Sequence, residues 1–78
     1  MGQMPKENLR DILAGNIRLF RARAGLSQDE FADKCGLHRT YIGSVERSER
    51  NVTLATLELL SKATGVSVTK LLSKKGVD

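Results

Sequence analysis

Hydrophobic residues recur along this chain at the spacing of helices, and the pattern begins at Leu9. Apolar positions in the first segment lie three or four residues apart, as one buried face of a helix requires. Asn8 can cap the start of this helix, and Gly25 can end it. The predicted buried face carries Leu9, Ile12, Leu13, Ile17 and Phe20.

Two short helices follow, joined at Gly36. Ser27 and Glu30 have the spacing of a capping box, so the second helix is expected to start there and to run to Cys35. Gly36 can adopt the positive φ of a sharp turn, and a third helix begins directly after it. Its apolar positions are Leu37, Tyr41, Ile42 and Val45, which leave a polar, basic face of His38, Arg39, Thr40, Gly43, Ser44 and Arg47.

The last third of the chain predicts a loop and two more helices. Residues 47–52 have no helical period, and Thr53 can cap a fourth helix that ends at Gly65. Ser67 can cap a fifth helix, with Lys74 and Lys75 in its last turn. The expected inward positions are Leu54, Leu57, Leu60 and Ala63 in the fourth helix and Val68, Leu71 and Leu72 in the fifth. No segment alternates with period two, so the predicted fold class is all-α with five helices.

The length of 78 residues favours a single domain. We expect an N-terminal arm over residues 1–7, a compact domain over 8–75 and a tail over 76–78. So small a core favours a partner subunit, because the single cysteine excludes an internal disulfide. Cys35 is expected to be a small buried thiol.

The net charge of +4 favours a polyanionic partner, and the placement of the arginines adds weight to it. Arg18, Arg21 and Arg23 share the first helix, and others surround the third. No apolar run has membrane length or signal-peptide character, so we expect a cytoplasmic, nucleoid-associated protein. With one histidine, one cysteine and no glycine-rich phosphate loop, we expect no enzyme activity, metal, cofactor or small-molecule ligand.

The pair of short helices around Gly36 is the informative unit. A helix that reads DNA must project past its neighbour to enter the major groove, and residues 27–47 have the lengths and the tight turn for this. Helical hairpins are also common as plain packing units. Small Ala32 suits a close approach of the two helices, while Ile42 and Val45 suit anchors beneath an outward face.

Gly25-Leu26-Ser27-Gln28-Asp29-Glu30-Phe31-Ala32, Gly36-Leu37-His38-Arg39-Thr40-Tyr41-Ile42 and Val45-Glu46-Arg47 together resemble the phage repressor and Cro-like (XRE-type) helix-turn-helix family. The likeness covers about residues 8–75 and implies a compact five-helix fold like that of lambda repressor. Within the family, Arg50-Asn51-Val52-Thr53 and the third-helix residues look most like the controller proteins of restriction–modification systems.

The resemblance implies roles for individual residues. Arg39 and Thr40 match positions that reach base edges, where a guanidinium can bridge guanine O6 and N7. Ser44 faces the groove by spacing, but many relatives carry longer side chains at 43 and 44, which favours a spacer role. The candidate base contacts are Arg39, Thr40, Ser44 and Arg50; the candidate backbone contacts are Gln28, His38, Tyr41, Arg47 and Asn51; Arg21 and Glu46 match a structural ion pair.

The sequence therefore predicts a homodimeric transcription regulator of a restriction–modification operon that binds a pseudo-palindromic, double-stranded DNA operator, with RNA polymerase as a further candidate partner. A phage-type repressor or an antitoxin regulator is the alternative within the family. A protein-interaction module that has lost its DNA affinity is the alternative of another class. The apolar residues available for a dimer interface are Val66, Val68, Leu71 and Leu72.

Overall fold

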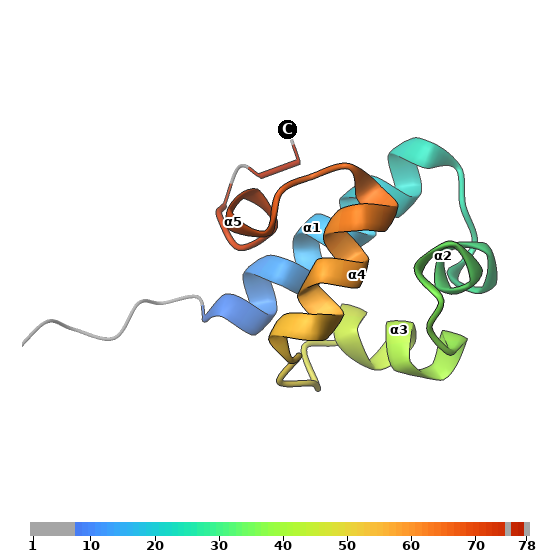
Figure 1. The fold of residues 1–78 in the computed structure, drawn as a ribbon, viewed down its shortest axis with the longest axis horizontal. Coiled ribbons are helices and arrows are strands. Elements are labelled where there is room, and N and C mark those ends of the chain that lie inside the picture. Colours follow the sequence, from blue (N-terminus) through green and yellow to red (C-terminus); the bar gives the residue numbers. More distant parts are fainter. Residues whose placement is uncertain (1–7, 75, 78) are drawn as a thin grey trace, which may run out of the picture.

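The computed structural model describes residues 8–74, 76 and 77, and within them every regular element is a helix (Figure 1). This confirms the all-α class and the five segments expected from the hydrophobic pattern. The predicted arm over residues 1–7 lies outside the described residues. The helices are α1 (Leu9–Ala24), α2 (Gln28–Cys35), α3 (Arg39–Glu46), α4 (Leu54–Thr64) and α5 (Val68–Leu71).

Local capping explains where most of these helices begin. The side chains of Asn8, Ser27, Thr53 and Ser67 each accept a hydrogen bond from a backbone N–H in the first turn of the helix that follows. The capping box of Ser27 is complete, because the Glu30 carboxylate also accepts from the Ser27 backbone N–H at 2.9 Å. These four predicted caps are confirmed.

The core lies between α1, α4 and the α2–α3 pair, and α5 packs against α1 and α4 on the opposite side from α2 (Figure 1). Phe31 of α2 is fully buried, and its ring centroid lies 5.9 Å from that of Phe20 on α1. Gly36 takes the left-handed conformation, with φ 72°, that turns the chain from α2 into α3. The buried hydrophobic residues are Leu13, Ala14, Ile17, Phe31, Ala32, Cys35, Ile42, Val45, Leu57, Leu60 and Leu71.

Two leucines that the pattern assigned to the core lie at the surface instead. Leu9 is 59% exposed and Leu54 is 77% exposed, so both inward assignments are wrong. Each is the first residue of its helix. Helical spacing gives the direction of a side chain, whereas burial also requires a neighbour at that height along the axis.

The fifth helix is shorter than expected, because it ends at Leu71 and leaves Lys74 in a turn beyond it. Asn16, a buried polar residue of α1, explains the end of this helix. Its amide nitrogen donates to the carbonyls of Leu71 at 2.7 Å and Ser73 at 2.9 Å. These bonds satisfy carbonyl groups that a longer helix would otherwise have used.

The described part of the expected tail is packed against the domain. Val77 is half-buried against the core, and its carbonyl accepts a hydrogen bond from Arg23 Nη1 at 2.7 Å. Gly76 lies so close to the chain that a Cβ atom there would overlap the carbonyl of Lys70. Residues 76 and 77 therefore belong to the compact unit.

Candidate nucleic-acid interface

A surface hollow of about 220 Å³ lies between the start of α2 and the outer face of α3. Gln28, the first residue of α2, forms one side of it. Arg39 and Thr40, from the first turn of α3, and Arg47, directly after α3, form the rest. The structure thus brings four of the predicted DNA-contacting residues around one hollow, and the exposed guanidinium groups of Arg39 and Arg47 make it basic.

Gly43 also lines this hollow, and it lies beneath the surrounding side chains. A Cβ atom at this position would lie 3.1 Å from Arg47 Nη1 and 3.5 Å from Gln28 Oε1. The absence of a side chain therefore keeps the centre of the hollow open. This placement fits the spacer role expected for position 43.

Ser44 does not share the outward face on which the helical spacing placed it. Its side chain is buried, donates to the Tyr41 carbonyl at 2.7 Å and accepts from Arg50 Nε at 3.0 Å. The outward orientation expected for Ser44 is wrong, because the loop after α3 folds back over it. In the free chain Ser44 orients Arg50.

Arg50 also contacts the ring of Tyr41. The guanidinium carbon of Arg50 lies 5.0 Å from the centroid of the Tyr41 ring, within the range of a cation–π interaction. Tyr41 itself is half-buried and packs against the core, as its helical spacing indicated. Arg50 is exposed and held at two points, by Ser44 and by the ring.

His38 caps the helix that carries Arg39 and Thr40. Its Nδ1 accepts a hydrogen bond from the backbone N–H of Thr40 at 3.1 Å. His38, a candidate backbone contact, therefore caps α3 in the structure. The cap fixes the first turn of α3, from which the candidate base contacts project.

Two carboxylates that the sequence did not identify lie beside the arginines of this face. Arg39 Nε lies 3.6 Å from Asp29 Oδ1, and both side chains are largely exposed. Arg47 donates two hydrogen bonds of 3.1 Å to the carboxylate of Glu49. Helical spacing gives no indication of either pair, since one joins two helices and the other forms within a loop.

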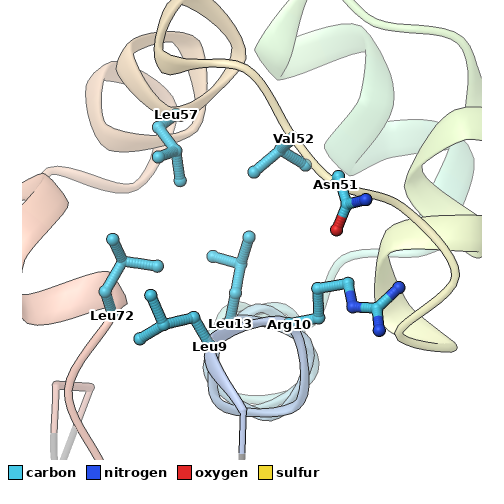
Figure 2. A pocket seen from close by; sticks show the side chains of 7 residues that line it. All are labelled: Leu9, Arg10, Leu13, Asn51, Val52, Leu57 and Leu72. Carbon is cyan, nitrogen blue, oxygen red and sulfur yellow. The ribbon is translucent and has the colours of Figure 1, made fainter.

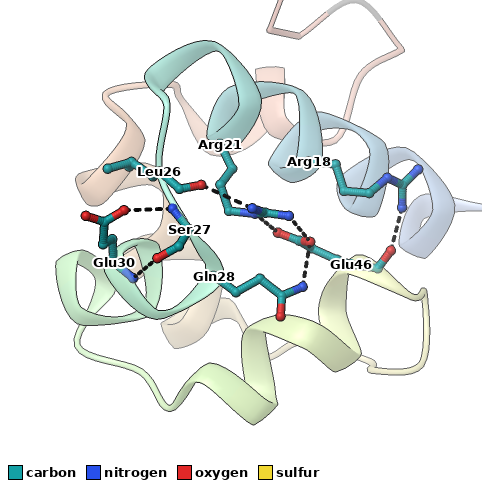
Figure 3. Close-up of polar contacts among 7 residues, drawn as sticks. All are labelled: Arg18, Arg21, Leu26, Ser27, Gln28, Glu30 and Glu46. Carbon is teal, nitrogen blue, oxygen red and sulfur yellow. Dashed lines mark hydrogen bonds and ion pairs between the residues drawn. The ribbon is translucent and has the colours of Figure 1, made fainter.

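A polar network centred on the buried Glu46 side chain joins α1, α2 and α3 (Figure 3). Arg21 of α1 donates to both carboxylate oxygens of Glu46 at the end of α3, at 2.7 and 3.0 Å. The structure thus forms the ion pair that the family resemblance implied. Gln28 Nε2 donates to the same carboxylate at 3.0 Å, so one of its two amide hydrogens is engaged within the protein.

The charge of Glu46 is maintained despite burial. Burial acts to raise its pKa, but hydrogen bonds from Arg21 and Gln28, together with the positive charges of Arg21 and Arg18, hold the pKa below the usual value for a glutamate. A charged Glu46 ties the end of α3 both to α1 and to the start of α2.

Three arginines of α1, Arg18, Arg21 and Arg23, serve the fold, which corrects the weight that the sequence gave to their clustering. Arg21 is occupied by Glu46, and Arg18 donates to the Glu46 backbone carbonyl. Arg23 donates to the carbonyl of Val77. The exposed basic residues of α2, α3 and the loop after α3 are Lys34, Arg39, Arg47 and Arg50.

An apolar hollow of about 170 Å³ lies beside that loop. Figure 2 shows aliphatic side chains from α1, the 47–53 loop, α4 and the segment after α5 around it, with the Arg10 guanidinium directed away. Asn51, a candidate backbone contact, lies at its edge and is exposed. The aliphatic lining consists of Leu9, Leu13, Val52, Leu57 and Leu72.

The four residues expected at a dimer interface differ in what they expose. Leu71 is fully buried in the core of the single chain and has no surface to offer a partner, so its assignment to an interface is wrong. Val66, Val68 and Leu72 are half-buried and pack against the core with part of their surface exposed.

The remaining chemistry of the described residues is limited. Cys35 is buried, as expected, and burial raises the pKa of its thiol to about 11. Within the described ranges no cluster of three or more His, Cys, Asp or Glu side chains could hold a metal ion. Across the same ranges, no helix has both the length and the apolar character that a membrane span requires.

Comparison with known proteins connects this geometry to a family. A family model described as helix-turn-helix matches residues 17–71. The control protein C.SmaI of Serratia marcescens is 56% identical over 70 residues, which cover 90% of this chain and 83% of that protein.

Two solved structures extend the comparison. The hypothetical transcription factor NHTF from Neisseria is 44% identical with a TM-score of 0.81, and the match covers 94% of this chain and 85% of that one. The restriction–modification controller protein C.Esp1396I, solved as a tetramer in complex with its natural 35-base-pair operator, is 33% identical with a TM-score of 0.76. That match covers 94% of this chain and all of that one (100%).

Proposed function

The chain belongs to the helix-turn-helix family whose model spans residues 17–71, and on that premise we propose that it is a transcription regulator that controls a restriction–modification operon by binding operator DNA. The similarity to the control protein C.SmaI and to the controller C.Esp1396I supports the choice of operon. Members of this family are DNA-binding regulators, and the proposal requires neither a catalytic step nor a cofactor.

One observation carries the proposal: Gln28 of α2, Arg39 and Thr40 of α3, and Arg47 directly after α3 surround one open hollow. α3 has eight residues and a free outer face, which suits insertion into a major groove about 12 Å wide. The N-terminus of α2 beside it provides backbone N–H groups and a favourable dipole for a phosphate. A helix in the groove and a helix end at the backbone are the two parts of this DNA-binding motif.

We assign the contacts by where each side chain is held. Arg39 and Thr40 project from the first turn of α3 and are proposed to contact base edges, together with Arg50 from the loop. A buried Ser44 is proposed to act through Arg50 rather than on a base. The proposed backbone contacts are Gln28, His38, Tyr41, Arg47 and Asn51.

The proposed protein is a homodimer, and we place its interface at the apolar hollow shown in Figure 2. Leu54 is 77% exposed and lies one helical turn before Leu57, which lines the hollow. An apolar cavity of about 150 Å³ can take up a benzene-sized molecule, so a hollow of about 170 Å³ can receive a leucine side chain. Related by a two-fold axis, each copy would insert Leu54 into the hollow of the other.

The proposed interface lies next to the loop that carries proposed DNA contacts. The hollow adjoins the loop that follows α3, and Asn51 of that loop lies at the edge of the hollow. Pairing through it would set the two α3 helices side by side, as binding to half-sites about one helical turn apart requires. Such an arrangement fits a pseudo-palindromic operator.

Salt dependence of DNA binding tests the function. Contacts to several phosphates release counterions, so the logarithm of the association constant should fall against the logarithm of salt concentration with a slope of about −0.9 per phosphate. The measurement uses fluorescence anisotropy with a labelled random-sequence duplex pool and a duplex selected from it by the protein. Binding to neither duplex at low salt would favour the protein-interaction alternative.

Binding to an operator also implies a further partner and a location in the cell. A dimer bound at a promoter either blocks RNA polymerase or recruits it, so polymerase is the proposed further partner. The protein would act in the cytoplasm, at the nucleoid, where operator DNA is found.

A further inference from the structure

Arg47, the exposed arginine directly after α3, lines the proposed DNA-binding hollow and already binds a carboxylate. Arg47 Nε and Nη2 donate to the two carboxylate oxygens of Glu49, both at 3.1 Å. Two parallel hydrogen bonds of this kind are also how a guanidinium binds a phosphate group. Glu49 therefore occupies the positions on Arg47 that a DNA phosphate would take.

The backbone of the loop holds Glu49 in this place. Residues two apart do not face each other on a helix, and here Ser48 lies between the pair with a left-handed φ of 61°. Such a conformation is uncommon for a residue other than glycine. The backbone N–H of Glu49 donates to the Ser44 carbonyl at 2.9 Å, and that of Ser48 to the Val45 carbonyl at 3.0 Å. The loop thus returns toward α3 and places the carboxylate beside the guanidinium.

We propose that Glu49 is an affinity-determining residue that acts as an internal substitute for phosphate on Arg47. This inference rests on the proposed DNA-binding function. When DNA binds, Arg47 either keeps Glu49 or exchanges it for a phosphate and leaves the carboxylate to attract a cation. In both cases the pair releases no net counterion, so Arg47 adds little to sequence-independent affinity.

The charge of Glu49 supports this role. The hydrogen bond from Arg47 lowers the pKa of the Glu49 carboxyl, and the charges of Arg47 and Arg50 act in the same direction. The carboxylate is therefore ionised at neutral pH. The side chains of Arg47 and Glu49 are 59% and 56% exposed, so an incoming phosphate can reach the pair.

Three variants of the full chain test this inference against salt. Glu49→Gln frees Arg47, and we expect about fivefold tighter binding to a labelled random-sequence duplex pool at about 0.1 M salt, with a slope steeper by about 0.9. Glu58→Gln makes the same change in net charge on α4, outside the hollow, and should leave the slope unchanged. The double variant Arg47→Gln with Glu49→Gln should return the slope to that of the wild type.

The outcomes separate the inference from the function on which it rests. Equal slopes for the wild type and Glu49→Gln, or equal gains from Glu49→Gln and Glu58→Gln, would overturn the inference alone. An affinity loss confined to duplexes with cytosine at one position would also overturn it, because Glu49 would then read a base edge. A wild-type protein that binds no duplex would overturn the proposed function and this inference together. Far-ultraviolet circular dichroism confirms that each variant is folded.

Discussion

Arg21 and Glu46 join the last turn of α1 to the last residue of α3 through two hydrogen bonds, Nε to Oε2 at 2.7 Å and Nη2 to Oε1 at 3.0 Å. Glu46 is 4% exposed, so its charge depends on these partners. The same carboxylate accepts from Gln28 at the start of α2. One buried group thus joins α1 to α2 and α3, the two helices that carry the proposed DNA contacts.

Glu46→Ala should therefore lower the free energy of unfolding by about 3–5 kcal/mol, because it leaves the Arg21 guanidinium without its partner. Urea denaturation followed by circular dichroism measures the change. Glu58→Ala, at an exposed position of α4, is the control and should change stability by less than about 0.5 kcal/mol. A loss below about 1 kcal/mol for Glu46→Ala would show that water replaces the carboxylate.

The depressed pKa of Glu46 predicts a pH dependence of stability. A carboxyl whose pKa is lower in the folded than in the unfolded chain binds more protons when unfolded, so its contribution is complete above its unfolded pKa of about 4.3. That contribution is lost as the pH falls through the folded value. The free energy of unfolding of the wild type, measured with urea, should thus fall below about pH 5, and that of Glu46→Gln should fall less. If the free energy of unfolding falls equally with pH in the two proteins, the acid sensitivity belongs to other carboxylates.

The sequence predicted the parts of the fold that depend on neighbouring residues. Caps such as Ser27 and the turn at Gly36 act within a few positions, and their residue types leave few alternatives. Leu9 and Leu54 were placed wrongly because their burial depends on which helix lies opposite. The end of α5 was also missed, since it depends on Asn16, more than fifty positions earlier in the chain.

The candidate interface was predictable to a similar extent. Resemblance to a family identified the residues around the hollow, and they are brought together as expected. The partners of these residues were not predictable. Asp29 reaches Arg39 across two helices, and Glu49 reaches Arg47 through an unusual backbone conformation at Ser48. Such contacts depend on loop geometry, for which composition and periodicity give no indication.

Gly15, within α1, is a position where a side chain should stabilise the protein. A Cβ atom there would contact only the end of the Arg18 side chain, at 3.9 Å. Gly15→Ala should raise the free energy of unfolding by about 0.5–1 kcal/mol, because alanine loses less backbone entropy in a helix. Gly43→Ala is the comparison. Its free energy of unfolding should rise less, because the added Cβ would lie 3.1 Å from Arg47 Nη1. Thermal unfolding measures both, and a destabilised Gly15→Ala would indicate close packing against a second copy.

The proposed dimer interface predicts different effects for two exposed leucines of α4. Leu54→Glu places a charge at the apolar hollow and should give a folded monomer in sedimentation equilibrium. Leu59→Glu makes the same change at a residue that is 40% exposed and lines a different hollow, beside Cys35, so it should remain dimeric. A dimeric Leu54→Glu protein would exclude this surface. Leu71 is unsuitable for the test, because a charge in the core would unfold the chain.

Arg39 and Gln28 should differ in what they contribute to DNA binding. Arg39 projects from the first turn of α3, where a guanidinium can form two hydrogen bonds with a guanine, so Arg39→Ala should lose about 1–3 kcal/mol of discrimination at particular base pairs. Gln28 begins α2 at the edge of the hollow, so Gln28→Ala should weaken binding to all duplexes by a similar factor.

Competition anisotropy measures both effects, using the selected duplex and its single-base-pair variants as competitors. Arg39→Ala should leave stability nearly unchanged, because its pair with Asp29 is exposed and such pairs contribute about 0–1 kcal/mol. Gln28→Ala also removes the hydrogen bond to Glu46, so urea unfolding must show that the variant is folded at the assay temperature. A uniform loss from Arg39→Ala would place its guanidinium at a phosphate. Base-specific losses from Gln28→Ala would instead require its second amide hydrogen to reach into the groove.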